Sequence, residues 1–319
     1  MMKIKEKTNV LFPTGSWVAL ITPFTAEGEV DMKGFATLVD FHVANNTDGL
    51  LFMGSTGETT SLFPQERREI IRSMTKYCRE KIPAFFGVTC PTTKATTELA
   101  RFAQDEGALG ILLTVPPYVA PPQEAVYEYF AEIARSVSLS VALYNNPGRV
   151  SVNINPDTVA RLADFPNVVA DKEATASVEH LTEVMGKVEG KLHLLCCDYP
   201  KYSLILPTLA MGGKGTANVA GNVIPREMAL MSSPWESFED TKRSRELYFD
   251  WLPLLKMLYS VSNPVVVKAA VEVLGFPAGP PRPPLPKLKG EKLEILKKML
   301  DDLGVSGHYG IRRKGEHNG

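Results

Sequence analysis

Residues 141–175 read VALYNNPGRVSVNINPDTVARLADFPNVVADKEAT and contain two short apolar runs with a helical segment between them. The runs, 141–144 and 168–171, are apolar with β-branched residues and predict strands, and the segment that begins near Pro156 predicts a helix. A strand, a helix and a second strand in this order are typical of a parallel sheet with crossover helices. The stretch therefore indicates the α/β class.

The same alternation continues on both sides of this stretch. The predicted strands are 17–21, 49–53, 84–88, 110–115, 141–144, 168–171, 192–196 and 215–219. The predicted helices begin near Asp31, Pro64, Thr92, Gln123, Pro156, Ser177, Ser203 and Pro225, several of which are favourable caps or first-turn residues. An open doubly wound sheet would have a Gly-rich turn after the first strand, where this chain has ITPF at 21–24. We therefore expect a (β/α)8 TIM barrel with a C-terminal helical extension.

The length of 319 residues is compatible with one large barrel. We assign 1–230 to the barrel with its active site and 231–305 to the helical extension, because strand-like runs stop at about Ser237. Residues 306–319 contain charged, Gly and His residues without apolar periodicity. We expect this tail to be disordered.

Composition narrows the class of function. Apolar residues make up 44% of the sequence, which is typical of a globular protein. The 35 basic residues nearly balance the 36 acidic ones, so the net charge of the chain does not favour binding to nucleic acid or to an anionic membrane. The first residues lack a signal-peptide apolar region, and no apolar run approaches the roughly 20 residues that span a bilayer, which predicts a cytoplasmic protein. The four cysteines are expected to be reduced, and the five histidines form no ligand set, so no metal is predicted.

Polar residues at strand exits are the candidates for chemistry, because TIM-barrel active sites lie at the C-terminal ends of the strands. The second predicted strand is followed by GSTGET at 54–59, where glycines flank Ser55 and Thr56. Such a turn can expose backbone N–H groups to a carboxylate. An ordinary loop with a capping hydroxyl is the simpler interpretation.

The fifth and fourth exits add aromatic and cationic groups. YNNPGR at 144–149 places Tyr144 at a strand end and Arg149 five residues later. A phenol can relay protons and a guanidinium can bind a carboxylate through two hydrogen bonds, although a rim aromatic and a surface ion pair would have the same sequence. VPPYVAPP at 115–122 presents Tyr118 on a rigid loop, where it could instead lie at a contact between subunits.

The sixth exit, VVADKEAT at 168–175, places Lys172 where the period-2 pattern continues inward. Lysine is rarely buried without a partner or a purpose. An amine acts as a nucleophile only where its surroundings favour the uncharged form, and a low-dielectric barrel mouth can supply them. The alternative is a lysine that extends to solvent and pairs with Asp171 or Glu173.

Together, GSTGE at 54–58, YNNPGR at 144–149 and KEAT at 172–175 resemble the dihydrodipicolinate synthase / N-acetylneuraminate lyase family in order and spacing. The resemblance covers roughly residues 15–285. It implies a covalent imine between Lys172 and the ketone of pyruvate or a similar 2-oxo acid, and no cofactor beyond that imine.

The resemblance also implies roles for the other residues. Ser55 and Thr56 would bind the pyruvate carboxylate, and Tyr144 would shuttle protons through Ser55 to a tyrosine from a neighbouring subunit. The expected catalytic residues are Lys172, Tyr144, Ser55 and Tyr118, and the expected substrate-binding residues are Thr56, Gly54, Arg149 and Ala217. The exchange of Tyr118 between subunits implies a homodimer or a homotetramer.

Arg149 bears on the second substrate. In the synthases of the family an arginine here serves an aldehyde that carries a carboxylate, which implies condensation of pyruvate with aspartate semialdehyde in lysine biosynthesis. Ser55, however, stands where the synthases usually have threonine. An aldolase, dehydratase or deaminase acting on a 2-oxo-3-deoxy sugar acid, sialic acid or a hydroxyproline-derived substrate remains an alternative, as does a non-catalytic barrel with a binding or regulatory role.

Overall fold

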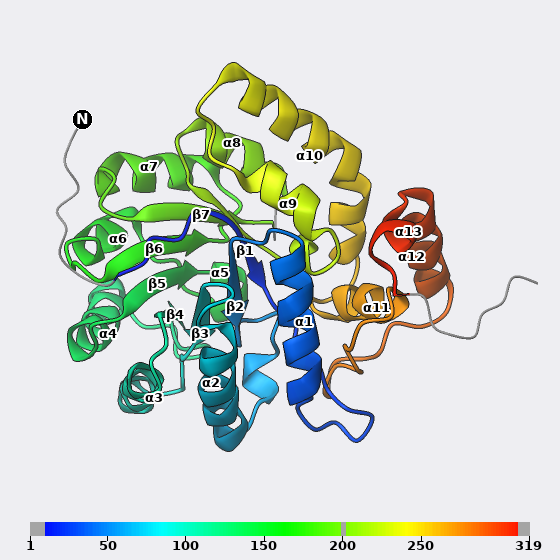
Figure 1. The fold of residues 1–319 in the computed structure, drawn as a ribbon. Coiled ribbons are helices and arrows are strands. Elements are labelled where there is room, and N and C mark those ends of the chain that lie inside the picture. The colour runs from blue at the N-terminus through cyan, green and yellow to red at the C-terminus, as the bar shows by residue number, and fades with distance from the viewer. Residues whose placement is uncertain (1–9, 199–201, 312–319) are drawn as a thin grey trace, which may run out of the picture.

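The computed structural model describes residues 10–198 and 202–311, which form a closed barrel of eight parallel strands (Figure 1). Each strand pairs with the next, and β8 pairs with β1 to close the ring. The strands are β1 (Gly15–Ala19), β2 (Gly49–Phe52), β3 (Ala84–Gly87), β4 (Gly110–Thr114), β5 (Ser140–Asn145), β6 (Val168–Glu173), β7 (His193–Cys197) and β8 (Gly215–Asn218). The predicted TIM barrel is confirmed.

Helices alternate with the strands and cover the outside of the barrel. They are α1 (Met32–Ala44), α2 (Pro64–Cys78), α3 (Thr93–Asp105), α4 (Gln123–Ser136), α5 (Pro147–Val150), α6 (Pro156–Leu162), α7 (Val178–Val188), α8 (Ile205–Ala210) and α9 (Pro225–Ser232). Short 3-10 helices are Thr59–Ser61, Tyr202–Leu204 and Ala220–Asn222. Local chemistry explains several starts: the Asp31, Thr92 and Ser177 side chains accept hydrogen bonds from the first turns of α1, α3 and α7.

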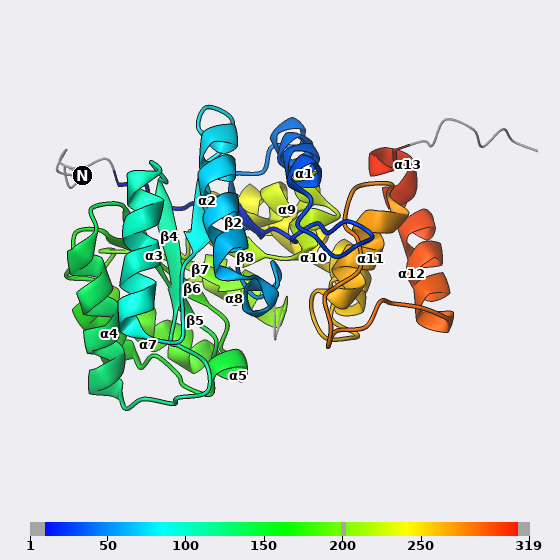
Figure 2. The ribbon, with the colours of Figure 1, turned by 90° about the horizontal axis from the view of Figure 1, so that it is seen from below.

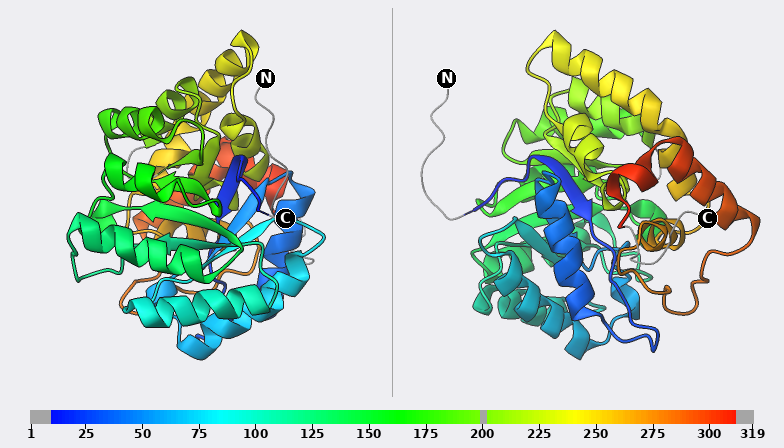
Figure 3. Two further views of the ribbon diagram at one scale, coloured as in Figure 1. Left: turned by 90° about the vertical axis from the view of Figure 1, so that its left-hand side faces the viewer. Right: turned by 45° about the vertical axis from the view of Figure 1, so that its right-hand side comes forward.

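The C-terminal extension consists of α10 (Phe238–Leu258), α11 (Val265–Val273), α12 (Glu291–Asp302) and α13 (Val305–Tyr309). The long helix α10 runs beside α8 and α9, and α11 to α13 gather on one side of the barrel (Figures 2 and 3). No helix within residues 10–198 and 202–311 combines the length and the apolar character needed to cross a membrane.

Large aromatic side chains fill the barrel interior. Trp17 of β1 and Phe85 of β3 are buried and meet edge to face, with ring centroids 4.8 Å apart. Glycines on adjacent strands make room for them: a Cβ at Gly49 would lie 2.5 Å from the Trp17 ring, and one at Gly110 would lie 2.4 Å from the Phe85 ring. The interior is therefore a packed core, and the chemistry is confined to the mouth at the strand ends.

The tail was predicted to be disordered from residue 306, but the structure shows residues 306–311 to be ordered. Helix α13 buries Val305 and Tyr309, and the Tyr309 ring packs edge-on against Phe41 of α1. The Tyr309 hydroxyl donates to Glu227 at 2.6 Å, and the Ile311 N–H donates to the Leu274 carbonyl. Tertiary packing thus orders a segment too short to show periodicity, while residues 312–319 lie outside the described residues.

His42 makes the stability of the fold dependent on pH. Its side chain is fully buried in α1 beside the Thr47 hydroxyl, at 2.9 Å, and burial lowers its pKa to about 3. The unfolded chain therefore binds a proton below about pH 6.5 that the folded chain does not bind until about pH 3, so stability falls as the pH falls through this window. We expect wild type to lose about 2 kcal/mol more than His42→Gln between pH 7 and pH 5, measured by urea unfolding.

Thr37→Ser provides the control, because it changes an exposed side chain of the same helix without removing a group that titrates, and it should keep the acid sensitivity of wild type. Equal acid sensitivity of wild type and His42→Gln would show that this histidine is not the cause.

Candidate active site

Strand β6 carries Lys172 into the mouth of the barrel. Its neighbours of the same parity, Ala170 and Ala174, belong to the interior cluster, and only 3% of Lys172 is exposed. Its Nζ lies 4.2 Å from the centroid of the Tyr144 ring, the residue opposite it on β5. The alternative of a lysine extended into solvent is thereby excluded.

Tyr144 lies between two hydrogen-bonding groups. Asn146 Nδ2 donates to its hydroxyl oxygen at 2.7 Å, and Ser55 Oγ lies 3.4 Å from the same oxygen. Because Asn146 donates the hydrogen bond to the phenol oxygen, the phenol can direct its own proton toward Ser55 or a substrate. Tyr144 and Ser55 are thus brought together as predicted, whereas the role of Asn146 was not predicted from the sequence.

The turn after β2 places Ser55 and Thr56 beside the mouth, with the Glu58 N–H donating to the Ser55 carbonyl. Thr56 is 2% exposed, and its Oγ1 accepts a hydrogen bond from Asn263 Nδ2 at 2.9 Å. Space is open at Gly54, where an added Cβ would have no neighbour within 4 Å. Ala217 of β8 is buried in the interior cluster that also contains Tyr144. The predicted cradle therefore surrounds the same mouth.

A buried ion pair from the C-terminal extension fixes this turn. Lys268 of α11 is 1% exposed and donates to Glu58 and to the Thr22 carbonyl, each at 2.9 Å. The second oxygen of Glu58 accepts the Arg282 backbone N–H at 2.8 Å. Burial lowers the pKa of Lys268 to about 8, which leaves the amine protonated at neutral pH. Glu58 has a left-handed backbone, with φ of 53°, so the pair holds a turn that costs conformational energy.

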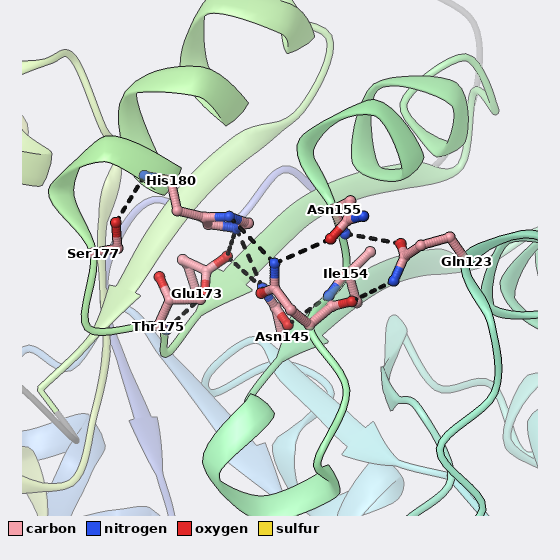
Figure 4. Close-up of polar contacts among 9 residues, drawn as sticks. Gln123, Asn145, Ile154, Asn155, Glu173, Thr175, Ser177 and His180 are labelled. Carbon is pink, nitrogen blue, oxygen red and sulfur yellow. Dashed lines mark hydrogen bonds and ion pairs between the residues drawn. The ribbon is translucent and has the colours of Figure 1, made fainter.

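A second polar network fixes the ends of β5 and β6 from the outer side of the barrel (Figure 4). Asn145 Nδ2 donates to Glu173 at 3.0 Å, and the His180 ring lies 3.0 Å from the same carboxylate oxygen. The other oxygen of Glu173 accepts the Thr175 N–H at 2.7 Å. Because Asn145 follows Tyr144 and Glu173 follows Lys172, these contacts hold in register the two strands that carry the mouth residues.

Asp171 is fully buried, and neither carboxylate oxygen has a hydrogen-bond partner among the described residues. Burial, followed by the charge of Glu173, raises its pKa well above the ordinary value. Strand alternation points Asp171 away from the mouth that Lys172 faces. It therefore faces the layer behind the strands rather than a substrate.

Arg149 lines a cavity beside this mouth. The cavity has a volume of about 320 Å³ and is lined by Gly148, Arg149 and residues 259–263. The guanidinium donates to the Asn263 carbonyl at 3.3 Å. A cation on the wall of an open cavity can bind a carboxylate-bearing ligand.

A carboxylate and a second phenol lie near the mouth. Asp198 follows β7, is 1% exposed and accepts the Tyr259 hydroxyl at 2.5 Å. Its other oxygen accepts the N–H groups of Val219 and Ala220, and burial raises its pKa. Asp198 follows a strand, so the search for polar residues at strand ends could have identified it as a candidate. No local pattern indicates its partner Tyr259, which lies 61 residues away in the sequence.

Tyr118 is not brought into the site within this chain. It lies in the loop after β4, is 99% exposed and has a left-handed backbone with φ of 79°. The described residues also contain no group of His, Cys, Asp and Glu side chains that could hold a metal ion.

A lysine buried at the mouth of a parallel barrel, beside a phenol and a hydroxyl, is the arrangement that a lyase of the aldolase type uses. A model of the dihydrodipicolinate synthetase family matches residues 12–303. The chain belongs to this family.

Comparison with individual proteins supports the same family. The chain is 35% identical over 294 residues to the 4-hydroxy-tetrahydrodipicolinate synthase of Lachnoclostridium phytofermentans. The aligned residues cover 92% of this chain and 98% of that protein. It is 37% identical over 295 residues to the synthase of the same name from Persephonella marina, with coverage of 91% and 98%. The crystal structure of dihydrodipicolinate synthase from Aquifex aeolicus is 34% identical and has a TM-score of 0.87, covering 94% of this chain and 100% of that chain.

Proposed function

We propose that the protein is a 4-hydroxy-tetrahydrodipicolinate synthase that joins pyruvate to aspartate semialdehyde through an imine on Lys172, in lysine biosynthesis. The observation that carries the proposal is the position of the Lys172 amine, buried at the mouth and 4.2 Å from the centre of the Tyr144 ring. Relatives that carry this name cover nearly the whole chain.

The steps follow from the groups at the mouth. The amine of Lys172 attacks the ketone carbon of pyruvate, and loss of water leaves the imine. The protonated imine then accepts the electrons of a C–H bond when the methyl carbon gives up a proton, which forms the enamine whose carbon attacks the aldehyde. Tyr144 and Ser55, 3.4 Å apart, carry the protons that these steps exchange. The imine itself serves as the electron sink, so we propose that no other cofactor is needed.

Thr56 and the turn around it are proposed to bind the pyruvate carboxylate. The Thr56 hydroxyl oxygen accepts a hydrogen bond from Asn263, so the hydroxyl proton of Thr56 remains available to a carboxylate. Gly54 has no side chain to close the approach, and Ala217 bounds the mouth from the buried face of β8.

We propose that the active enzyme is a homodimer or homotetramer in which Tyr118 completes the proton path of a neighbouring subunit. The support is the 99% exposure of this tyrosine on a loop of left-handed backbone, followed by Val119 at 59% exposure. We also propose a cytoplasmic location, because all four cysteines of the chain are free thiols.

Borohydride reduction in the presence of pyruvate tests the proposal. Reduction should add pyruvate covalently to Lys172, located by peptide mass spectrometry, and the enzyme should consume aspartate semialdehyde only when pyruvate is present. A chain that acquires no adduct would be a binding protein and not a synthase.

Arg149→Ala should raise the KM for aspartate semialdehyde about 100-fold while leaving pyruvate trapping intact, because the guanidinium lines the adjoining cavity and would bind the carboxylate of the aldehyde. Steady-state kinetics with each substrate varied in turn measure this effect. Arg161→Ala is the control, since this arginine pairs with Glu124 on the exposed surface. An unchanged KM for the aldehyde in Arg149→Ala would remove Arg149 from the site.

A further inference from the structure

Asn146 lies at the start of α5, and its side chain does not cap this helix. Its backbone carbonyl accepts the N–H groups of Arg149 and Val150 at 2.9 and 3.1 Å. An asparagine at such a position usually also accepts an N–H of the first turn through its side chain, which stabilises the helix. The side chain of Asn146 makes no such bond, and its Nδ2 donates instead to the phenol oxygen of Tyr144 at 2.7 Å.

The amide oxygen of Asn146 gains no contact in return. Only 2% of the residue is exposed, and its Oδ1 is buried without a hydrogen-bond partner among the described residues. A buried carbonyl without a partner and an unused helix cap both cost stability. Local choices that cost stability are expected at functional sites. The contact with Tyr144 is therefore the part of this side chain that needs a functional explanation.

This contact gives the proton of Tyr144 a direction. An amide N–H can only donate, so the phenol oxygen accepts from Asn146 and its own proton must point elsewhere. Ser55 Oγ lies 3.4 Å from the phenol oxygen and can receive that proton. When the proton leaves, the phenol oxygen becomes negative, and the hydrogen bond from Asn146 becomes charge-assisted and stronger. A contact that strengthens in this way favours the transition state over the ground state.

We propose that Asn146 is a positioning residue that acts through Tyr144: it directs the phenol proton toward the reacting groups and stabilises the negative oxygen that the proton leaves behind. The inference rests on the proposed function. In that reaction the phenol gives its proton to the hydroxyl group that leaves as water when the imine on Lys172 forms. The phenol oxygen then takes a proton from the methyl carbon when the enamine forms. The phenol is thereby restored, and Asn146 itself neither gains nor loses a proton.

Asn146→Leu tests the donor, because it removes the amide and keeps a side chain of similar size. The variant should still add pyruvate to Lys172 during long borohydride treatment. Exchange of the pyruvate methyl protons with heavy water, followed by NMR without aldehyde, should slow by about 10- to 100-fold. A variant that traps pyruvate and exchanges at the wild-type rate would overturn the inference alone. Failure of wild type to trap pyruvate would overturn the proposed function together with it.

Asn146→Asp keeps the shape of the side chain and changes only what it can donate. At about pH 9 the new carboxyl group has lost its proton and can only accept, so the phenol would donate its proton to the carboxylate. The variant should then exchange the methyl protons as slowly as Asn146→Leu. A purely spatial role of Asn146, or an amide whose oxygen faces the phenol, predicts the wild-type rate instead, and that result would contradict the proposal.

Asn155→Leu is the matched control. Asn155 precedes α6 as Asn146 precedes α5, and its side chain likewise makes no cap hydrogen bond. It is exposed, however, and its side chain accepts a hydrogen bond from Asn153. This variant should exchange the methyl protons at the wild-type rate. Exchange as slow as in Asn146→Leu would show that the loss does not come from the contact with Tyr144, and the inference would be wrong.

Discussion

Lys172→Ala should abolish covalent trapping of pyruvate and reduce turnover by about four orders of magnitude or more, because it removes the amine that forms the imine. The variant should still fold, since the buried ion pairs among the described residues, His180–Glu173 and Lys268–Glu58, do not involve Lys172. Borohydride reduction followed by mass spectrometry measures the adduct, and a coupled assay measures turnover.

Two variants control this result. Lys172→Met keeps the length of the side chain and should be equally inactive, which excludes an effect of the cavity that alanine leaves. Lys214→Ala removes an exposed lysine near the start of β8 and should retain full trapping. An adduct that persists in Lys172→Ala would place the reactive amine elsewhere and end the proposed mechanism.

Lys268→Met should destabilise the protein by about 3–5 kcal/mol, because it leaves the Glu58 carboxylate buried without its cation. Activity should fall as well, since Glu58 belongs to the turn that carries Ser55 and Thr56. Urea unfolding measures the loss of stability, and pyruvate KM reports the displaced turn.

The double variant Lys268→Met/Glu58→Gln should be more stable than Lys268→Met alone, because it removes the uncompensated charge. Lys298→Met is the control from an exposed pair with Asp302, and it should have little effect. If Lys268→Met unfolded at the same urea concentration as wild type, the buried pair would contribute nothing to the fold.

The sequence predicted the barrel because each of its units is encoded locally. Lys172 lies two residues from Ala170 and two from Ala174 and so follows the period of a strand, and Asp31, Thr92 and Ser177 cap the helices they precede. Tyr144 and Ser55 could be placed at one mouth because parallel strands all end on the same side. The prediction therefore succeeded for the strands, the helix caps and the side of the barrel on which the strands end, but it missed the local hydrogen bond from Asn146 to Tyr144.

Contacts between distant segments could not be predicted in this way. Thr56 and Asn263 are 207 residues apart, and Glu58 and Lys268 are 210 residues apart, so no local pattern joins them. Helix α13 was missed for the same reason, because packing of Tyr309 against Phe41 of α1 orders it. The two hydrogen bonds and helix α13 all depend on packing of the extension against the barrel. Sequence periodicity does not describe such packing.

The extension supplies part of the wall of the site, which limits how this barrel can be reused as a scaffold. Through Tyr259, Asn263 and Lys268 it supplies hydrogen bonds to Asp198, Thr56 and Glu58 at the mouth. A chimera that joins this barrel to another enzyme's C-terminal segment would separate these partners. Directed evolution toward new aldehydes should therefore recombine the 54–59 turn and the 259–268 segment as a single block.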